Sequence, residues 1–185
     1  AKASGAEGIF VFYPGKAGGA FIKQYAQAGL QGKIPLYSVF TVDSIALPKL
    51  QKANMNGVMG SVMTQFWAPD LDTPQNKKFV SGFKKKYGRY PSFYAAQSYD
   101  TIFLIKSAVE AVKGDLSNKD GMRAAMEKAN FPSVRGKFSY GNNHFPIQNF
   151  YSREVVKDPD GVWTTSVREV VLKNHQDTYA KDCSM

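Results

Sequence analysis

The chain has 185 residues, of which 43% are hydrophobic and 21% charged, a composition that supports an ordinary buried core and excludes disordered and fibrous proteins. Its formal net charge of +9 would permit nucleic acid as a partner. The basic residues are scattered, however, and their only run, Lys84–Lys86, is typical of a solvated helix end. We therefore expect no nucleic-acid partner, and the lack of a run of 18 apolar residues predicts no membrane span.

The start of the chain resembles the last turn of a helix. Residues 1–6 have that character, with Gly5 in the place of a C-terminal cap, and they lack the basic, apolar and small-residue pattern of a signal peptide. We therefore expect a fragment of a longer protein. The single cysteine, Cys183, is either a free thiol or half of a disulfide whose partner lies outside this chain.

The first elements form half of a βαβ unit. Residues 9–13 are a continuous apolar run, typical of a strand covered on both faces in a parallel sheet. After the Pro14-Gly15 turn, apolar residues recur at helical spacing up to Gly29. Residues 34–39 are the next strand, which should run parallel to the first. Tyr13–Lys16 and Phe40–Asp43 then share the carboxyl edge of the sheet, where ligands bind in open α/β sheets.

The rest of the chain alternates helices and strands. A short helix over 43–52 and a strand over 57–65 lead to an irregular link at 66–72. Three helices follow, with starts predicted at Thr73-Pro74, at Ser92 and at the capping box Ser117–Asp120. From residue 134 the pattern indicates strands over 135–140, 148–156 and 162–172, with a hairpin turn at 158–161. The predicted fold class is α/β.

Few residues offer chemistry. His144 and His175 have no Cys or acidic residue near them at metal-ligand spacing, so we expect no metal and no cofactor. Gly15–Gly19 lacks the Gly-Lys-Ser/Thr ending of a phosphate loop; it is either a loop that holds an anion or a close-packed turn. No nucleophile elbow occurs. The sequence thus argues against an enzyme, although an α/β enzyme with unrecognised catalytic residues stays an alternative.

Aromatic residues stand at the ends of several elements. They are Tyr13, Phe40, Trp67 and Tyr94. Each alone suits a structural role, but their common placement at α/β edges favours an apolar pocket for a small molecule.

The order of elements and five strings, residues 9–30, 60–67, 76–91, 94–100 and 131–138, resemble the type I periplasmic solute-binding proteins of ABC importers, in the leucine/isoleucine/valine-binding branch. This chain resembles their C-terminal half. The resemblance implies two α/β lobes that close on a ligand, here with residues 1–68 in the second lobe, 69–147 in an incomplete first lobe, and 148–185 crossing back to the second lobe as a β-hairpin and tail.

The resemblance also implies a periplasmic location and a membrane permease as partner, with the N-terminal half of the same protein completing the ligand site and offering a partner for Cys183. It places ligand contacts on the Pro14-Gly15 turn, on Phe40 and on Tyr94. With the neighbouring positions, the predicted ligand-binding residues are Tyr13, Pro14, Gly15, Lys16, Phe40, Thr41 and Tyr94, with Trp67 at the hinge or cleft edge.

The ligand class depends on position 40. In the amino-acid binders of this family an acidic residue there pairs with the ligand ammonium, whereas this chain has Phe40. A buried ammonium without a carboxylate costs several kcal/mol. We therefore expect an aromatic or aliphatic carboxylate as ligand. Asp43 could restore the acidic function, which keeps branched-chain amino acids as the alternative.

Overall fold

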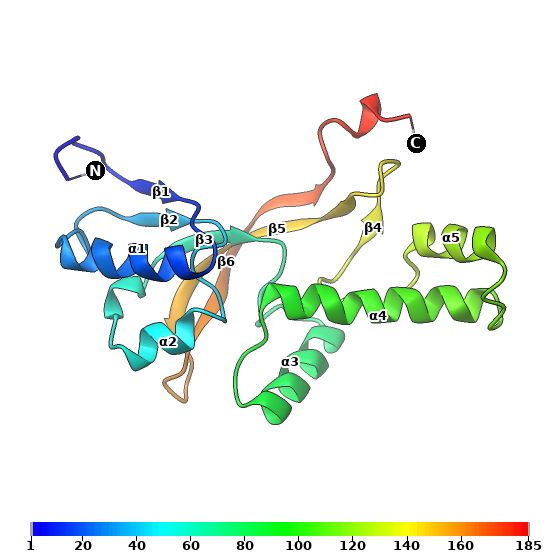
Figure 1. Cartoon of the computed structure of the whole chain (residues 1–185), viewed down its shortest axis with the longest axis horizontal. Coiled ribbons are helices and arrows are strands. Elements are labelled where there is room, and N and C mark those ends of the chain that lie inside the picture. Colours follow the sequence, from blue (N-terminus) through cyan, green and yellow to red (C-terminus); the bar gives the residue numbers. More distant parts are fainter. Residues whose placement is uncertain (1, 185) are drawn as a thin grey trace.

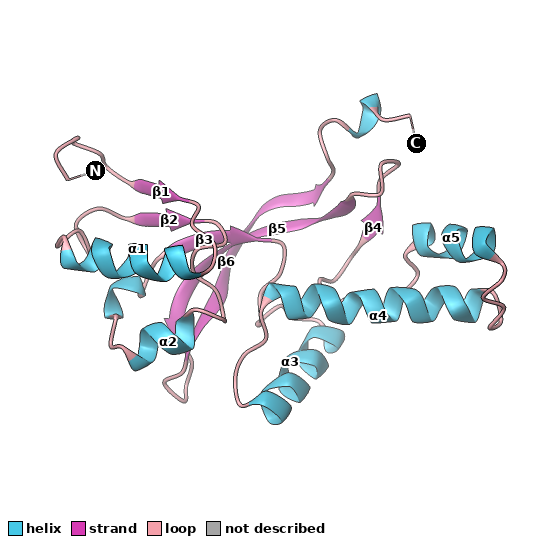
Figure 2. Cartoon of the chain, in the orientation of Figure 1, coloured by secondary structure: helices cyan, strands magenta, loops and turns pink. Residues whose placement is uncertain are grey.

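The computed structural model describes residues 2–184; Ala1 and Met185, which begin and end the predicted ranges 1–68 and 148–185, lie outside the described residues. Figure 1 shows two groups of elements on either side of a central strand layer, α1 and α2 on one side and α3, α4 and α5 on the other. Figure 2 shows how long strands run between these helical groups. Within the described range no helix is long and apolar enough to cross a membrane.

The sheet joins parallel and antiparallel strands. β1 (Ile9–Val11), β2 (Leu36–Ser38) and β3 (Val62–Gln65) are parallel neighbours, as the predicted βαβ unit requires. The other strands are β4 (Ser139–Tyr140), β5 (Pro146–Lys157) and β6 (Trp163–His175). β5 pairs antiparallel with β3, β4 and β6. The chain therefore has a mixed α/β fold.

Two helices cover one face of the parallel strands. They are α1 (Lys16–Gln27) and α2 (Leu47–Lys52), followed by the short 3₁₀ helix η1 (Asn56–Val58). We call the cluster beneath them the α1–α2 core; its buried residues are Val11, Ile22, Tyr25, Leu30, Leu36, Val42, Leu47, Leu50, Val58, Met63, Val155 and Trp163.

The expectation that both faces of the first strand are covered is wrong for this chain. Phe10 is 73% exposed and Phe12 57%, because α1 and α2 pack on the opposite face, where Val11 is buried. The strand predicted over 57–65 also begins later, at Val62, since residues 56–58 form η1 and Gly60 has a positive φ of 73°. The local apolar pattern therefore overestimated the burial of the first strand and the length of the third.

The α3–α4 core lies further along β5, around Tyr151. Its helices are α3 (Pro74–Tyr87), capped by the Thr73 side chain as predicted, and α4 (Phe93–Ala111), which begins after Ser92 as predicted and is capped by the Ser92 side chain. Its buried residues are Phe66, Trp67, Ala68, Leu71, Phe79, Val80, Phe93, Ala96, Val134 and Tyr151.

α5 (Lys119–Lys128) packs on α4 and β4. The predicted cap of α5 shifts by one residue: Asn118 accepts a hydrogen bond from the Gly121 amide, while Ser117 bonds to Asp115. The strand predicted over 135–140 also shrinks to Ser139–Tyr140, because the residues before it form a turn in which Gly136 donates to the Ser133 carbonyl.

The β5–β6 pair spans both cores. Val155 belongs to the α1–α2 core and Tyr151 to the α3–α4 core, so one strand crosses from one to the other. The ladder has register shifts between residues 148 and 153. At its far end the predicted turn at 158–161 closes the hairpin, with the Asp158 amide donating to the Val162 carbonyl at 2.9 Å.

A polar contact joins α3 to the tip of this hairpin. The Tyr90 hydroxyl donates to Asp158 Oδ2 at 2.8 Å, and Lys84 Nζ lies 3.6 Å from the same oxygen and 4.2 Å from the Tyr90 ring centroid. Burial tends to raise the pKa of Asp158. Hydrogen bonds from Tyr90 and from the amides of Val162 and Asp160, with the Lys84 charge, outweigh burial and hold this pKa below its ordinary value.

This contact predicts a pH-dependent stability. Because the folded pKa is lowered, the contribution of the Asp158 carboxylate is complete above its ordinary value of 3.8 and is lost as the pH falls through the lower folded pKa. We expect Asp158→Asn to reduce the free energy of unfolding by about 1.5 kcal/mol at pH 6, and by less at pH 3.

Urea unfolding at both pH values measures this loss of unfolding free energy. Asp160→Asn, in the exposed part of the same turn, is the control, and an equal loss for Asp158→Asn at both pH values would contradict the prediction.

Candidate ligand-binding site

A pocket of about 450 Å³ lies at the carboxyl edge of the parallel strands. It is lined by the start of α1, by the segment that follows β2 and leads through α2, and by Tyr94 from the first turn of α4. The lining residues are Gly15, Lys16, Gly19, Phe40, Thr41, Asp43, Ile45, Ala46, Lys49, Leu50 and Tyr94. The volume is in the range of small-molecule sites.

The structure brings five of the seven predicted ligand-binding residues to this pocket. They are Gly15, Lys16, Phe40, Thr41 and Tyr94. Tyr13 and Pro14 are not among the lining residues, and the Tyr13 ring packs on Phe21 with 5.5 Å between centroids. Trp67 is fully buried in the α3–α4 core, where its indole N–H donates to Asn76 Oδ1 at 2.7 Å. Ligand contact by the seven residues, and the place of Trp67 at the hinge or cleft edge, stay predictions.

The pocket wall is held by close packing at the start of α1. The Tyr13 amide donates to Thr41 Oγ1 at 2.9 Å, and the Thr41 hydroxyl donates to the Val39 carbonyl at 3.1 Å, so the ends of the first two strands are tied together. A Cβ added at Gly18 would overlap the Tyr13 carbonyl oxygen and lie 2.9 Å from that of Thr41. Close packing of the strand-to-helix turn therefore accounts for at least one glycine of the 15–19 loop.

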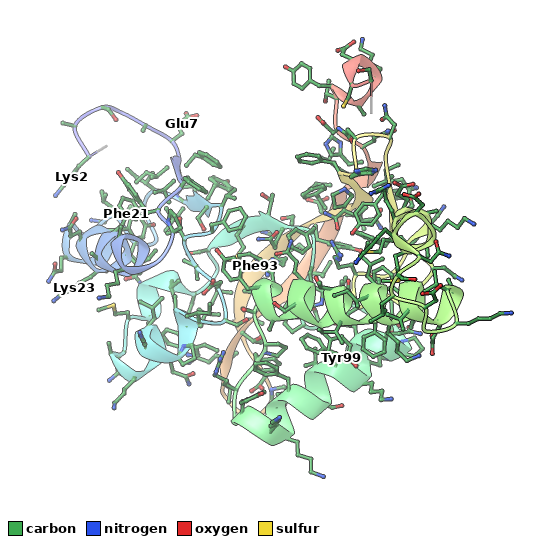
Figure 3. All side chains as sticks on the ribbon, turned by 45° about the vertical axis from the view of Figure 1, so that its right-hand side comes forward. Lys2, Glu7, Phe21, Lys23, Phe93 and Tyr99 are labelled. Atoms are coloured by element: carbon green, nitrogen blue, oxygen red, sulfur yellow. The ribbon has the colours of Figure 1, made fainter. Side chains whose placement is uncertain are left out.

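Phe40 links the two sides of the pocket. Its φ of 56° lies in the left-handed region, which aromatic residues rarely adopt. The ring packs edge-on against Phe93 of α4, 5.0 Å between centroids, and against Phe12, 5.9 Å. Figure 3 shows Phe93 at the end of α4 that adjoins the strand layer. Backbone strain of this kind clusters at ligand sites, and here it presents an aromatic ring between the cores.

Charged groups of both signs line the pocket. Lys16 and Lys49 are the cations and Asp43 is the acid. Asp43 Oδ1 accepts hydrogen bonds from the amides of Ile45 and Ala46, at 2.8 and 3.0 Å, which fixes its carboxylate at the turn before α2. Five lining residues were not among the predicted ligand-binding residues: Gly19, Ile45, Ala46, Lys49 and Leu50. The helix predicted over 43–52, next to the strand edge, was the signal for four of them.

Comparisons with known proteins agree with this architecture. The family described as "Periplasmic binding protein" matches residues 1–160. The Leu/Ile/Val-binding protein homolog 6 of Brucella abortus (strain 2308) is 33% identical over 170 residues, which are 88% of this chain and 42% of that protein. This chain thus spans less than half the length of this curated relative.

Solved structures give the same result. A solute-binding protein of an ABC transporter from R. palustris, in complex with benzoate, is 30% identical with a TM-score of 0.81, covering 97% of this chain and 46% of that one. A second, from Rhodopseudomonas palustris HaA2 in complex with p-hydroxybenzoic acid, is 31% identical with a TM-score of 0.80, covering 96% and 48%. The chain therefore belongs to the periplasmic binding protein family and has the type I fold of ABC-transporter solute-binding proteins.

Proposed function

We propose that this chain is part of the solute-binding component of an ABC importer, and that its pocket binds a small carboxylate, preferably an aromatic acid. The observation that carries this proposal is the aromatic wall formed by Phe40 and Tyr94, both of which pack on the buried ring of Phe93. Such a wall suits a planar apolar ring, and Lys16 and Lys49 at the pocket supply positive charge for a carboxylate.

The similar structures support an aromatic ligand. The two Rhodopseudomonas proteins at 30% and 31% identity are complexes with benzoate and p-hydroxybenzoic acid. The leucine-binding protein of Thermotoga maritima is 21% identical, with a TM-score of 0.67, and supports the fold alone. We propose an aromatic acid for this chain because Phe40 cannot form an ion pair with the ammonium group of an amino acid.

Branched-chain amino acids are the second candidate. Asp43 lines the pocket, so a carboxylate is available for an ammonium group from a position close to Phe40. The curated relatives carry the name Leu/Ile/Val-binding protein homolog. The two candidates differ in one requirement, because an amino acid needs the Asp43 charge and an aromatic acid is repelled by it.

The proposed mode of action is capture between two lobes without bond chemistry. The residue ranges 1–68, 69–147 and 148–185 are the proposed lobe segments, and the two cores joined by β3, β5 and β6 support this division. We propose that the N-terminal half of the same protein completes the site, that the loaded form delivers its ligand to a membrane permease, and that the protein works in the periplasm.

Thermal unfolding of the natural full-length protein with added ligands tests the ligand class. We expect benzoate or 4-hydroxybenzoate at about 100 times its Kd to stabilise the fold by about 2.7 kcal/mol, which raises the Tm by several degrees. Leucine and valine should give no shift. Stabilisation by leucine or valine alone would reject the aromatic acid in favour of the amino acid.

Two tyrosine variants test whether benzoate binds in this pocket. Tyr94→Ala should reduce the shift caused by benzoate, because Tyr94 lines the pocket. Tyr87→Ala is the control, since Tyr87 is similarly exposed, 54% against 48%, and also packs on a neighbouring phenylalanine. Equal shifts in both variants would place the ligand elsewhere.

A further inference from the structure

Phe93 stands behind the aromatic wall of the pocket. It is the first residue of α4 and is only 2% exposed, and Figure 3 shows it where α4 meets the strand layer. Phe93 is not among the lining residues, but its ring contacts two residues that are. The distance between ring centroids is 5.0 Å to Phe40 and 4.0 Å to Tyr94. Both aromatic residues of the wall therefore rest on one buried ring.

The two lining rings have little other aromatic support in the described part of the chain. Tyr94 is 48% exposed, and within residues 2–184 its ring packs on no aromatic ring except that of Phe93. Phe40 has one further ring contact, with Phe12 at 5.9 Å, but Phe12 lies on the uncovered face of the first strands and is itself exposed. Phe93 is thus the buried partner that both rings share.

The backbone of Phe40 shows why this contact matters for the orientation of its ring. Its φ of 56° is costly for an aromatic residue and persists only where the surroundings over-determine it. On the backbone side, the Thr41 hydroxyl donates to the Val39 carbonyl at 3.1 Å. On the side-chain side, the Phe40 ring meets Phe93 at an interplanar angle of 76°, the edge-on geometry that aromatic pairs favour. Loss of the Phe93 ring would leave the Phe40 side chain free to turn.

Phe93 is itself held in place by the core. The Ser92 hydroxyl oxygen accepts from the Ala95 amide at 3.3 Å and caps α4, which fixes the backbone at Phe93. The ring of Phe66 packs edge-on against Phe93 from behind, with 6.0 Å between centroids and an angle of 87°. Because interiors are close-packed, the Phe93 ring cannot turn without repacking the α3–α4 core. The core therefore dictates the orientation of the wall.

We propose that Phe93 determines the preference of the pocket for planar aromatic acids: it holds the rings of Phe40 and Tyr94 in a fixed orientation, so that they favour a flat ring over a saturated one. Contacts between two aromatic rings gain from their quadrupoles only in defined geometries, whereas a saturated ring is thicker and gains from burial alone. Phe93 is then a positioning residue that acts through Phe40 and Tyr94. This inference rests on the proposed function and assigns its aromatic preference to a residue outside the pocket lining.

The test compares benzoate with cyclohexanecarboxylate, its saturated analogue of the same charge, by titration calorimetry on the natural full-length protein. The wild type should bind benzoate about tenfold more tightly. Phe93→Leu should weaken benzoate binding by about tenfold and change cyclohexanecarboxylate binding by less than about twofold. In a Tyr94→Leu background the same change should weaken benzoate binding only about threefold, because one of the two rings that Phe93 positions is already gone.

Phe79→Leu is the matched control for loss of core packing. Phe79 belongs to the same α3–α4 core, is 6% exposed and also contacts three aromatic rings, those of Trp67, Phe83 and Tyr99. Within the described structure it neither lines the pocket nor contacts the rings of Phe40 and Tyr94. Both variants should lower the Tm of the unliganded protein by several degrees. Phe79→Leu should leave the ratio of the two affinities unchanged.

Three results would overturn the inference while carboxylate binding stands. The first is a parallel loss of affinity for both acids in Phe93→Leu, and the second is the same loss of preference in Phe79→Leu. The third is full additivity of Phe93→Leu and Tyr94→Leu, which would show that Phe93 does not act through the Tyr94 ring.

The wild type separates failure of the inference from failure of the proposed function. Equal affinity for the two acids would overturn the inference alone among claims about carboxylate binding, whereas binding of neither acid would overturn the proposed function and the inference with it. If Phe93→Leu does not fold, Phe93→Met decides, because methionine adapts to irregular core space. A lost preference for benzoate then supports the inference, and an unchanged preference overturns it.

Discussion

Gly18→Ala is expected to lower the free energy of unfolding by about 2 kcal/mol or more and to abolish ligand binding at the pocket. The added methyl group would overlap the Tyr13 carbonyl oxygen and crowd that of Thr41, and both are backbone atoms that cannot turn aside. Relief requires α1 to move away from the ends of β1 and β2. Urea unfolding and thermal shift with benzoate measure the two effects.

Gly19→Ala is the control within the same helix. A Cβ at Gly19 meets no atom within 4 Å, so alanine should increase the free energy of unfolding by about 0.5–1 kcal/mol through its better helix propensity. Gly19 lines the pocket, so this comparison concerns stability alone. If the two variants had the same stability, the close approach of α1 to the strand ends would be wrong.

Asp100→Ala should cost about 3–5 kcal/mol of unfolding free energy. Asp100, 1% exposed, accepts hydrogen bonds from Arg135 Nε at 2.9 Å, from the Ser133 hydroxyl at 2.6 Å and from the Val134 amide at 2.9 Å. Its loss leaves the buried Arg135 with Gln148 and the rings of Phe138 and Phe66, whose centroids lie 4.0 and 5.6 Å from its guanidinium carbon. Urea unfolding gives the magnitude.

The comparison with Glu110→Ala isolates burial as the cause. Glu110 is on the same helix and pairs with Lys106, but both side chains are exposed, so its loss should stay within about 0.5 kcal/mol. Adding Arg135→Met to Asp100→Ala should recover part of the stability, because the second change removes the uncompensated cation. Strict additivity of the two changes would show that they do not form one network.

Features that depend on local chemistry were predictable from the sequence. Thr73 accepts from the Asn76 amide and Gly88 ends α3 in the left-handed conformation, because caps are decided within a few residues. The same holds for the turn at 158–161 and for the parallel pairing of β1 and β2. These elements place Gly15, Lys16, Phe40 and Thr41 at one edge, which is why these four predicted residues line the pocket.

Features that depend on how distant segments pack together could not be predicted from the sequence. The positive φ of Phe40 has no sequence signature, since aromatic residues normally avoid that region. The exposure of Phe10 depends on which face of the sheet α1 packs against. The burial of Arg153 in β5 did have a sequence signal, because it lies between the buried apolar positions Tyr151 and Val155 on one face of the strand. The sequence of one strand does not show which groups surround the guanidinium.

The register shifts of the β5–β6 ladder, between residues 148 and 153, have a mechanical consequence. Extra residues in one strand break the regular ladder and let it bend, while the regular pairing from Arg153 to Lys157 keeps the rest straight. The bend therefore lies where β5 passes from the α3–α4 core to the α1–α2 core, so it sets the angle between the two cores.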